Sequence, residues 1–437
     1  MADLSITFAG IRSPNPFWLA SGPPTNTGDQ VARAFDAGWG GCVWKTLGDP
    51  IVNVSSRFAS IDANGHRMIG FNNIELITDR PLEVNLREIR EIKRRYPDRA
   101  VLVSVMEDAR EDWQQLIRRI EDAGADGLEL NFGCPHGMCE RGMGSAIGQE
   151  PEVLAKILSW AKEVATTPVL VKLTPNITDI REPALAAVDA GADGLSLINT
   201  IKSLMGVDLD RFVPYPVVGE RSTHGGMCGP AVKPIALRMV AQLAGEARIG
   251  VPLSGIGGIA TWRDAAEFIA LGATSVQVCT AVMHYGFRIV EDMIDGLSNY
   301  LDDKGFASVE ELRGRALPAL VDWGDLDLNY KVVARLVRER CIGCDLCYVA
   351  CRDAAAGCIH RPGEVPAAGH VAPDAEPARQ ALTADPRYRT PWVDETECIG
   401  CNLCSLVCPV HGCLTMEPVD QGKRFESWNQ RVAGSSE

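Results

Sequence analysis

The fold is indicated by a stretch that occurs twice, as Asp122-Ala-Gly-Ala-Asp-Gly-Leu-Glu-Leu130 and as Asp189-Ala-Gly-Ala-Asp-Gly-Leu-Ser-Leu197. More distant copies lie at residues 36–44 and 271–278. Each copy contains the end of a helix, a glycine that can adopt the left-handed cap conformation, and the start of a short buried strand. The repeat therefore predicts several helix-to-strand turns within one α/β domain.

Short apolar runs with the character of buried strands alternate with helical patterns over the first two thirds of the chain. The runs are 17–20, 41–46, 101–106, 127–133, 169–173, 194–199, 251–255 and 275–280, and the helical patterns are 29–37, 81–95, 111–123, 151–164, 181–190, 233–244 and 262–271. Eight strands with helices between most of them predict a (β/α)8 barrel. A doubly wound sheet would contain similar turns and is the alternative architecture.

The length of 437 residues and the change in composition along the chain both predict more than one domain. We expect a barrel at 1–302, a polar helical connector at 303–337 with helices near 308–315 and 330–338, a cysteine-dense ferredoxin-like module at 338–418, and a frayed polar tail at 419–437. The connection 352–397 contains an insertion rich in Ala and Pro at about 361–385. Such a segment is most simply an exposed insertion without chemistry.

The overall charge and hydropathy exclude two classes of partner. The net charge is −14, whereas nucleic acids and anionic membranes bind basic patches. No apolar run approaches the roughly 18 residues that a membrane span needs, and the segment 1–4 lacks the basic start of a secretory signal. We therefore expect a cytoplasmic protein.

Two cysteine runs predict two [4Fe–4S] clusters. They read Cys341-x2-Cys344-x2-Cys347-x3-Cys351 and Cys398-x2-Cys401-x2-Cys404-x3-Cys408-Pro409. In this bacterial ferredoxin pattern the fourth cysteine of each run ligates the other cluster. The expected ligand sets are Cys341, Cys344, Cys347 and Cys408 for cluster 1, and Cys398, Cys401, Cys404 and Cys351 for cluster 2. Zinc, the alternative, usually takes two Cys-x2-Cys pairs per ion. Cys358 and Cys413 fall outside the pattern and are expected to be packing residues.

Clusters of this kind exchange single electrons, so the barrel should hold an acceptor for them. FMN is the economical cofactor, because it accepts a hydride and exchanges its electrons one at a time with clusters. Lys45 and Lys172 lie at strand ends, where a lysine needs an anion or an electron-rich acceptor. A reduced flavin is one such partner and a buried carboxylate is the other. Gly257 and Gly258 follow the seventh strand, where barrels commonly bind phosphate, although a tight turn also needs glycine.

Polar side chains and one thiol stand at the other strand ends. Neutral amides both donate and accept hydrogen bonds, so Asn73, Asn131 and Asn199 suit a planar ring with alternating C=O and N–H groups. A single asparagine is more often a turn or cap residue. Cys134 ends the fourth strand and opens a glycine-rich loop. A thiol with a pKa of about 8.5 can act as a general acid near neutral pH, whereas the alternative is a small buried apolar residue.

At this point the sequence resembles a known family. The segments Asn131-Phe-Gly-Cys-Pro-His-Gly-Met138, Glu140-Arg-Gly-Met-Gly144, Lys172-Leu-Thr-Pro-Asn176, Asn73-Ile-Glu-Leu-Ile77, Asn199-Thr200 and the cluster motifs are similar to those of dihydropyrimidine dehydrogenases. More specifically, it resembles the bacterial catalytic subunits, which join an FMN barrel of the dihydroorotate dehydrogenase type to a ferredoxin module. It covers about residues 4 to 418.

The resemblance implies a role for individual residues. Cys134 matches the general acid, and the pyrimidine-binding positions match Asn73, Glu75, Asn131, Asn199 and Thr200. The FMN contacts match Ser21, Lys45, Thr46, Lys172, Gly229, Gly257, Gly258, Cys279 and Thr280. One position departs from the pattern: the larger relatives have a serine before the catalytic cysteine, and this chain has Gly133.

The implied reaction is reduction of the 5,6 double bond of uracil or thymine. Hydride would pass from FMN N5 to C6, and Cys134 would protonate C5 while the loop 137–148 closes over the ring. The chain has no Gly-x-Gly-x-x-Gly motif that opens a βαβ unit. The resemblance therefore implies that a separate FAD-containing flavoprotein subunit binds NAD(P)H and reduces the clusters, with this chain as a homodimer within a heterotetramer.

Two other functions are consistent with parts of the sequence. Dihydroorotate oxidation uses the same kind of barrel, but its pocket should offer a cation to the substrate carboxylate. A purely electron-transferring protein would use the barrel only as a docking body, and the polar strand ends argue against it.

Overall fold

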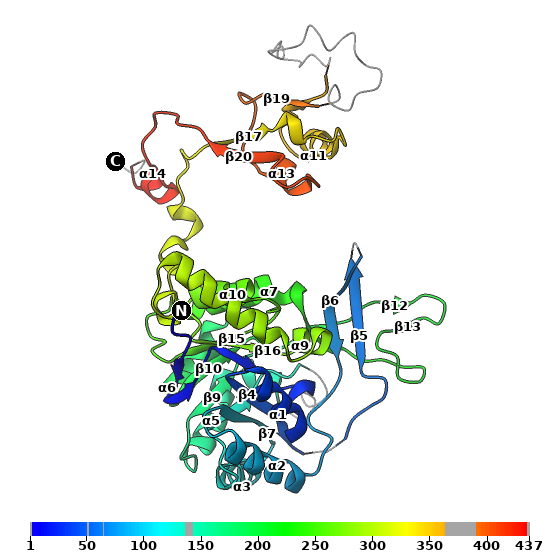
Figure 1. Cartoon of the computed structure of the whole chain (residues 1–437), viewed down its shortest axis with the longest axis vertical. Coiled ribbons are helices and arrows are strands. Elements are labelled where there is room, and N and C mark those ends of the chain that lie inside the picture. The colour runs from blue at the N-terminus through cyan, green and yellow to red at the C-terminus, as the bar shows by residue number, and fades with distance from the viewer. Residues whose placement is uncertain (1, 50–51, 64, 136–142, 363–389, 435–437) are drawn as a thin grey trace. The chain divides into compact units, whose positions relative to one another are not determined.

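The computed structural model describes residues 2–49, 52–63, 65–135, 143–362 and 390–434. The chain forms two compact units, Met1–Leu320 and Val321–Glu437 (Figure 1). Each unit has its own hydrophobic core. Within the described ranges, the chain contains no helix with the length and apolar character of a membrane span.

The first unit is a closed barrel of eight parallel strands, which confirms the predicted architecture and excludes the doubly wound sheet. In chain order the strands are β3 (Phe17–Leu19), β4 (Gly41–Gly48), β7 (Ala100–Met106), β8 (Gly127–Asn131), β9 (Val169–Lys172), β10 (Gly194–Leu197), β15 (Leu253–Ile256) and β16 (Ser275–Val278). Each strand pairs with the next, and β16 closes the barrel on β3. All eight predicted runs therefore form barrel strands.

Helices cover the outside of the barrel (Figure 1). They are α1 (Gly28–Ala37), α2 (Leu82–Arg95), α3 (Arg110–Asp122), α5 (Pro151–Lys162), α6 (Arg181–Asp189), α7 (Lys233–Ala244), α8 (Trp262–Ala270) and α10 (Ile289–Lys304). Each has a buried face, and caps define their ends: Thr27 accepts a hydrogen bond from Gln30 N, and Gly38 ends α1 with φ 116°. Two short helices, α4 (Ser145–Gly148) and α9 (Thr280–Tyr285), follow β8 and β16.

A four-stranded antiparallel sheet is built from two segments inserted between barrel elements. It has the order β11–β14–β6–β5, with β5 at Phe58–Ala63, β6 at His66–Asn73, β11 at Ile201–Ser203 and β14 at Gly225–Cys228. Strands β5 and β6 follow β4 in the chain, and strands β11 and β14 follow β10. Because these insertions follow the carboxyl ends of parallel strands, they extend the face on which a barrel carries its site.

The second unit has the predicted ferredoxin-like arrangement. Strand β17 (Val332–Leu336) pairs with β20 (Leu414–Pro418), and β18 (Ile359–His360) pairs with β19 (Trp392–Val393). Helices α11 (Leu346–Ala354) and α13 (Leu403–Val407) each begin within a cysteine run. The expected insertion at 361–385 lies almost wholly outside the described residues.

The predicted helical connector is wrong. Residues 330–338 contain strand β17 instead of a helix, because Val332, Val333 and Leu336 lie in a ladder with β20. Residues 308–315 contain only a 3₁₀ turn at Val309–Glu311, and the segment up to Leu320 belongs to the barrel unit. Polar composition suggested a surface helix, but tertiary pairing determines the structure here.

The predicted frayed tail is also wrong for the described residues up to 434. Helix α14 (Trp428–Gly434) lies beside the segment that begins the second unit. The Trp323 and Trp428 rings are 6.5 Å apart, and the Asn429 amide donates to Asp325 at 2.8 Å. Leu328 N also donates to Glu426 O at 2.9 Å. The tail therefore completes the second unit by pairing with its first residues.

Asp264 gives a prediction about the barrel unit. It caps α8 through the backbone N–H groups of Ala260 and Thr261, and it accepts from Lys233 Nζ at 2.5 Å. Burial alone would raise the pKa of Asp264, but hydrogen bonds from Lys233, Ala260 and Thr261 outweigh it and hold the pKa below its usual value. We expect Asp264→Ala to lower the free energy of unfolding by about 1–2 kcal/mol at pH 7.

Because the pKa is lowered in the folded state, this contribution is present above the unfolded value of about 4 and is lost as the pH falls through the folded value. Urea unfolding followed by circular dichroism should show the deficit of the variant narrowing as the pH falls below about 5. The control is Glu267→Gln, which alters the other, half-exposed partner of Lys233. An equal loss of unfolding free energy in both variants would contradict the capping role of Asp264.

Candidate active site

A cavity opens at the carboxyl ends of the barrel strands. Its lining includes the following residues that the sequence predicted for substrate, flavin or acid: Ser21, Lys45, Thr46, Asn73, Glu75, Asn131, Cys134, Lys172, Asn199, Thr200, Gly257 and Cys279. The remaining three, Gly229, Gly258 and Thr280, line a second cavity. The two cavities share Cys228, Ile256, Gly257 and Cys279, so they are adjacent.

A chain of hydrogen bonds links the polar side chains at the strand ends. The Asn199 amide donates to Asn131 Oδ1 at 2.8 Å, and the Asn131 amide donates to Thr46 Oγ1 at 3.2 Å. Thr46 also shares hydrogen bonds with Ser21 at 3.2 Å and with Ser104 at 2.9 Å. These bonds orient the side chains, so the cavity presents ordered donors and acceptors.

Both lysines of the cavity have buried carboxylate partners. Lys45 Nζ lies 3.1 Å from Glu75 Oε2, and Arg57 lies 2.9 Å from the other oxygen of Glu75. Lys172 Nζ lies 3.2 Å from Glu129 Oε1. The carboxylate partner considered as an alternative to a flavin is therefore present in both cases, yet both lysines still line the cavity. A buried cation can meet a carboxylate on one side and a ligand on the other.

Cys134 lies at the edge of this cavity in a small apolar cluster. It is 5% exposed and packs with Ile77, Met106 and Met143. The strand β8 ends at Asn131, three residues earlier, so the thiol lies just beyond the barrel wall. Half of the predicted mobile loop 137–148, residues 137–142, lies outside the described residues, and the described half contains the short helix α4.

Gly133, the position that departs from the larger relatives, lies directly against Asn199. A Cβ atom on Gly133 would be 2.5 Å from Asn199 Cβ and 2.6 Å from its Nδ2 atom. These distances are too short for any real contact, so a serine here requires Asn199 to move. Glycine therefore allows Asn199 to approach Asn131.

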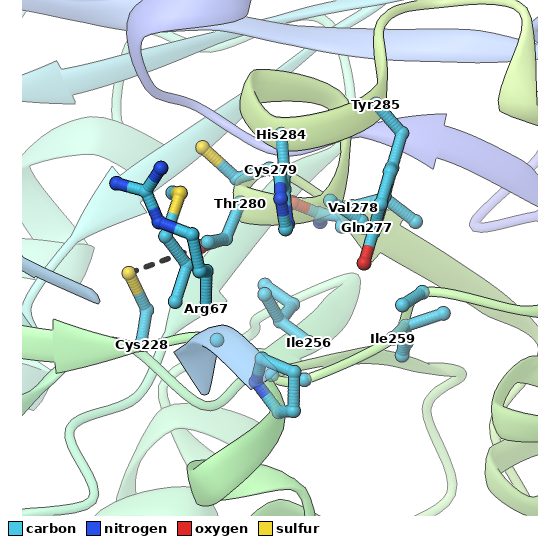
Figure 2. A pocket seen from close by; sticks show the side chains of 17 residues that line it. Arg67, Cys228, Ile256, Ile259, Gln277, Val278, Cys279, Thr280, His284 and Tyr285 are labelled. Carbon is cyan, nitrogen blue, oxygen red and sulfur yellow. Dashed lines mark hydrogen bonds between the residues drawn. The ribbon is translucent and has the colours of Figure 1, made fainter. Parts of the chain in front are cut away.

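The second cavity has the features of an anion site (Figure 2). Gly257 and Gly258 have φ values of 123° and 75°, which favour glycine, and both residues line the cavity. Thr280 adds a hydroxyl at the start of α9. Figure 2 shows Arg67 and His284 beside this lining. Neither residue was predicted from the sequence. Arg67 lies in the β5–β6 hairpin, and no motif in the sequence marks it as a binding residue.

The thiols between the two cavities are poor nucleophiles. Burial raises the pKa of Cys228 to about 11 and that of Cys279 to about 12. Both therefore remain protonated near neutral pH. Thr280 donates to Cys228 Sγ at 3.1 Å, so Cys228 serves as a hydrogen-bond acceptor in the wall.

One cavity of the second unit gathers the four cysteines that the sequence assigns to cluster 2. It is lined by Cys351, Cys398, Cys401 and Cys404, together with apolar residues such as Met416. Within the described ranges, no set of three or more ligand-type side chains is close enough for a single metal ion. Cys358 lines the same cavity as a fifth thiol. A cavity surrounded by thiols suits a larger group such as a cubane, which takes one cysteine at each iron.

The two cysteine runs follow the same backbone path. Gly343 and Gly400 have φ values of 67° and 72°, and Asp345 and Asn402 have 62° and 69°. Left-handed residues at the same two places curl each loop in the same way. The run at 341–347 therefore forms a loop equivalent to the one at 398–404. Cys358 is buried, with its Sγ 3.6 Å from that of Cys351.

These features define a barrel oxidoreductase joined to an iron–sulfur electron-transfer module. The family model "Dihydroorotate dehydrogenase" matches residues 3–301, and the model "4Fe-4S dicluster domain" matches residues 340–412. The chain belongs to the dihydroorotate dehydrogenase family.

Relatives match one or both units. "NAD-dependent dihydropyrimidine dehydrogenase subunit PreA" of Escherichia coli K12 is 44% identical over 419 residues, 95% of this chain and 96% of that protein. "Dihydropyrimidine dehydrogenase (NADP(+)), chloroplastic" of Arabidopsis thaliana is 44% identical over 337 residues, which cover 74% of this chain and 79% of that protein. "Dihydroorotate dehydrogenase B (NAD(+)), catalytic subunit" of Pyrococcus abyssi is 38% identical over 322 residues, which cover 72% of this chain and 99% of that protein. The resemblance drawn from the sequence motifs is confirmed.

The contact between Gly133 and Asn199 can be tested by adding one methyl group. We expect Gly133→Ala to lower the free energy of unfolding by about 1–3 kcal/mol, because the new Cβ must displace Asn199. Urea unfolding of the whole protein measures this loss. The matched control is Gly250→Ala, since a Cβ there meets no atom within 4 Å. Equal stability of the two variants would contradict the close contact.

Proposed function

We propose that this chain is the catalytic subunit of a dihydropyrimidine dehydrogenase, which reduces the 5,6 double bond of uracil or thymine. The observation that carries this proposal is the electrostatic character of the cavity. Its amides Asn131 and Asn199 are ordered by a mutual hydrogen bond, and its two lysines are each paired with a carboxylate. A neutral ring with alternating C=O and N–H groups matches such a wall.

The same observation disfavours dihydroorotate as the substrate. Orotate and dihydroorotate carry a carboxylate, and burial of this group needs an uncompensated cation. In the described lining of the cavity, the cations are Lys45 and Lys172, and Glu75 and Glu129 already offset their charges. Glu75 would also repel a second carboxylate.

The residues around the two adjacent cavities fit FMN. Lys45 and Lys172 would face the ring, Ser21 and Thr46 would hydrogen-bond to it, and the backbone at Gly257 and Gly258 would hold the phosphate. Gly229, Cys279 and Thr280 would complete these contacts. When bound, FMN supplies the hydride for C6 of the pyrimidine. The amides Asn73, Asn131 and Asn199, with Thr200 and Glu75, would hold the pyrimidine ring against it.

Cys134 would supply the proton for C5. Its neighbours in the small cluster are the apolar residues Ile77, Met106 and Met143. A thiol of ordinary pKa, about 8.5, is mostly protonated near neutral pH and can donate that proton to carbon. The short distance in sequence to Asn131 would place the donor next to the bound ring. Closure of the following loop would exclude water from the step.

The two clusters would deliver electrons one at a time from another protein. This role needs a donor that binds NAD(P)H, and we propose a separate FAD-containing flavoprotein subunit, with this chain as a homodimer in a heterotetramer. The name "subunit" of the Escherichia coli relative supports a partner of some kind.

The substrate class can be tested with the purified chain and an artificial one-electron donor under anaerobic conditions. We expect reduction of uracil or thymine and no turnover of dihydroorotate with an artificial acceptor. We expect Cys134→Ala to lower the rate of uracil reduction by about 10²- to 10⁴-fold with an unchanged flavin content. Cys42→Ala, a buried cysteine of β4 outside the cavity, is the control. Full activity of the Cys134 variant would refute the acid assignment, and a flavin-free wild type would favour electron transfer alone.

The cluster ligands can be tested by iron content. We expect Cys401→Ser to remove up to half of the protein-bound iron, because the exposed thiol of Cys401 lines the cavity of cluster 2. Cys358→Ala should keep all of it, since that residue packs beside the ligands. Iron analysis and low-temperature electron paramagnetic resonance of the reduced proteins measure both outcomes. Loss of iron in the Cys358 variant alone would reverse the assignment.

A further inference from the structure

We propose that Glu129 is a positioning residue, which holds Lys172 at the floor of the cavity and sets the charge against which a bound flavin is reduced. This inference rests on the proposed function, because it assigns a role to a side chain that does not itself line the cavity. Glu129 is fully buried in β8, two residues before Asn131.

The carboxylate of Glu129 accepts hydrogen bonds from two other strands of the barrel, and a third strand supports one of the donors. Its Oε2 atom accepts a hydrogen bond from Ser196 Oγ of β10 at 2.7 Å and another from Gln277 Nε2 of β16 at 3.0 Å. Ser254 Oγ of β15 accepts from the same Gln277 amide at 3.3 Å. Side chains from β10, β15 and β16 can converge on β8 only across the barrel interior, so this network lies inside the barrel.

The other oxygen of Glu129 serves Lys172 alone. Oε1 lies 3.2 Å from Lys172 Nζ but has no hydrogen bond of good geometry, so the contact is an ion pair. One oxygen is therefore anchored, and the other is directed at the ammonium group at the end of β9. The side chain of Lys172 is 6% exposed, and it lines the cavity.

Structural stability alone does not explain this arrangement. Barrel interiors are usually filled by branched apolar side chains, and a buried ion pair is often no more stabilising than apolar residues of equal volume. The barrel nevertheless holds a carboxylate and a glutamine whose Oε1 atom has no partner among the described residues. A polar network of this kind is retained when it orients a functional group.

The two buried lysines differ in their partners. Glu75 is shared by Lys45 and the partly exposed Arg57, and Arg57 also pairs with Asp79 at 3.5 Å, so two carboxylates offset two cations. Glu129 offsets Lys172 alone. The loss of the Glu129 charge would therefore add one positive charge below the cavity, where water screens it little. A reduced flavin carries negative charge on its pyrimidine side, so the added charge would favour reduction.

The test uses the whole protein with Glu129→Gln, which keeps the shape and an oxygen for Ser196 but removes the charge. We expect the flavin midpoint potential to rise, so that at a fixed solution potential the ratio of oxidised to reduced flavin falls at least about tenfold, or about 30 mV for two electrons. Ser196→Ala removes a hydrogen bond without a change of charge, and its shift should stay below about threefold. Anaerobic spectroelectrochemistry measures the flavin, and electron paramagnetic resonance follows the clusters separately.

A second variant keeps the inference testable if Glu129→Gln does not fold. Glu129→Asp retains the charge but shortens the reach to Lys172, so the FMN dissociation constant of the flavin-depleted protein should rise at least threefold while the potential stays near that of the wild type. A purely structural role would lower the melting temperature and leave both quantities unchanged. Unchanged potential and FMN affinity in flavin-containing variants would overturn the inference, whereas absence of flavin from the wild type would overturn the proposed function itself.

Discussion

Pairing of β16 with β3 is the interaction on which the site depends. Val276 and Val278 lie opposite Phe17 and Leu19, and this ladder closes eight parallel strands into a ring. Closure brings all eight carboxyl ends to one face, so residues as distant in sequence as Ser21 and Cys279 line one cavity. An open sheet of the same strands would place its first and last members at opposite edges. The position of the cavity therefore depends on closure of the barrel, and the individual side chains determine only its lining.

The charges of the site follow from burial within that ring. A lysine at the end of an apolar strand cannot stay buried unless an anion accompanies it, and Glu75 and Glu129 provide one for Lys45 and Lys172. Because these charges are compensated, the proposed substrate contacts come mainly from the neutral amides Asn73, Asn131 and Asn199, which line the same cavity. Selection among pyrimidine rings would then depend on hydrogen-bond pattern and shape more than on net charge.

The sequence predicted those parts of the structure that local patterns determine. The eight strands, the cysteine runs and the polar strand ends could be found because buried strands and metal-binding loops each have a short-range signature. The partner of Lys45 could not, since Glu75 comes from an insertion whose path no local pattern reveals. Strand β17 and helix α14 were missed for a related reason: each depends on a distant segment, β20 in one case and residues near Trp323 in the other. Arg67 was missed because an exposed arginine in a hairpin has no distinctive context.

The sheet β11–β14–β6–β5 gives this barrel a property that independent loops would lack. Asn73 of β6 pairs with Gly226 of β14, and Gly226 pairs with Lys202 of β11. The excursions after β4 and after β10, which deliver Asn73 and Thr200 to the cavity, are thus joined by a continuous backbone ladder. A one-residue insertion in either excursion would shift the register and turn its side chains to the opposite face. Divergence of ring preference in this architecture should therefore proceed by matched changes in both excursions, a coupling that barrels with separate loops do not impose.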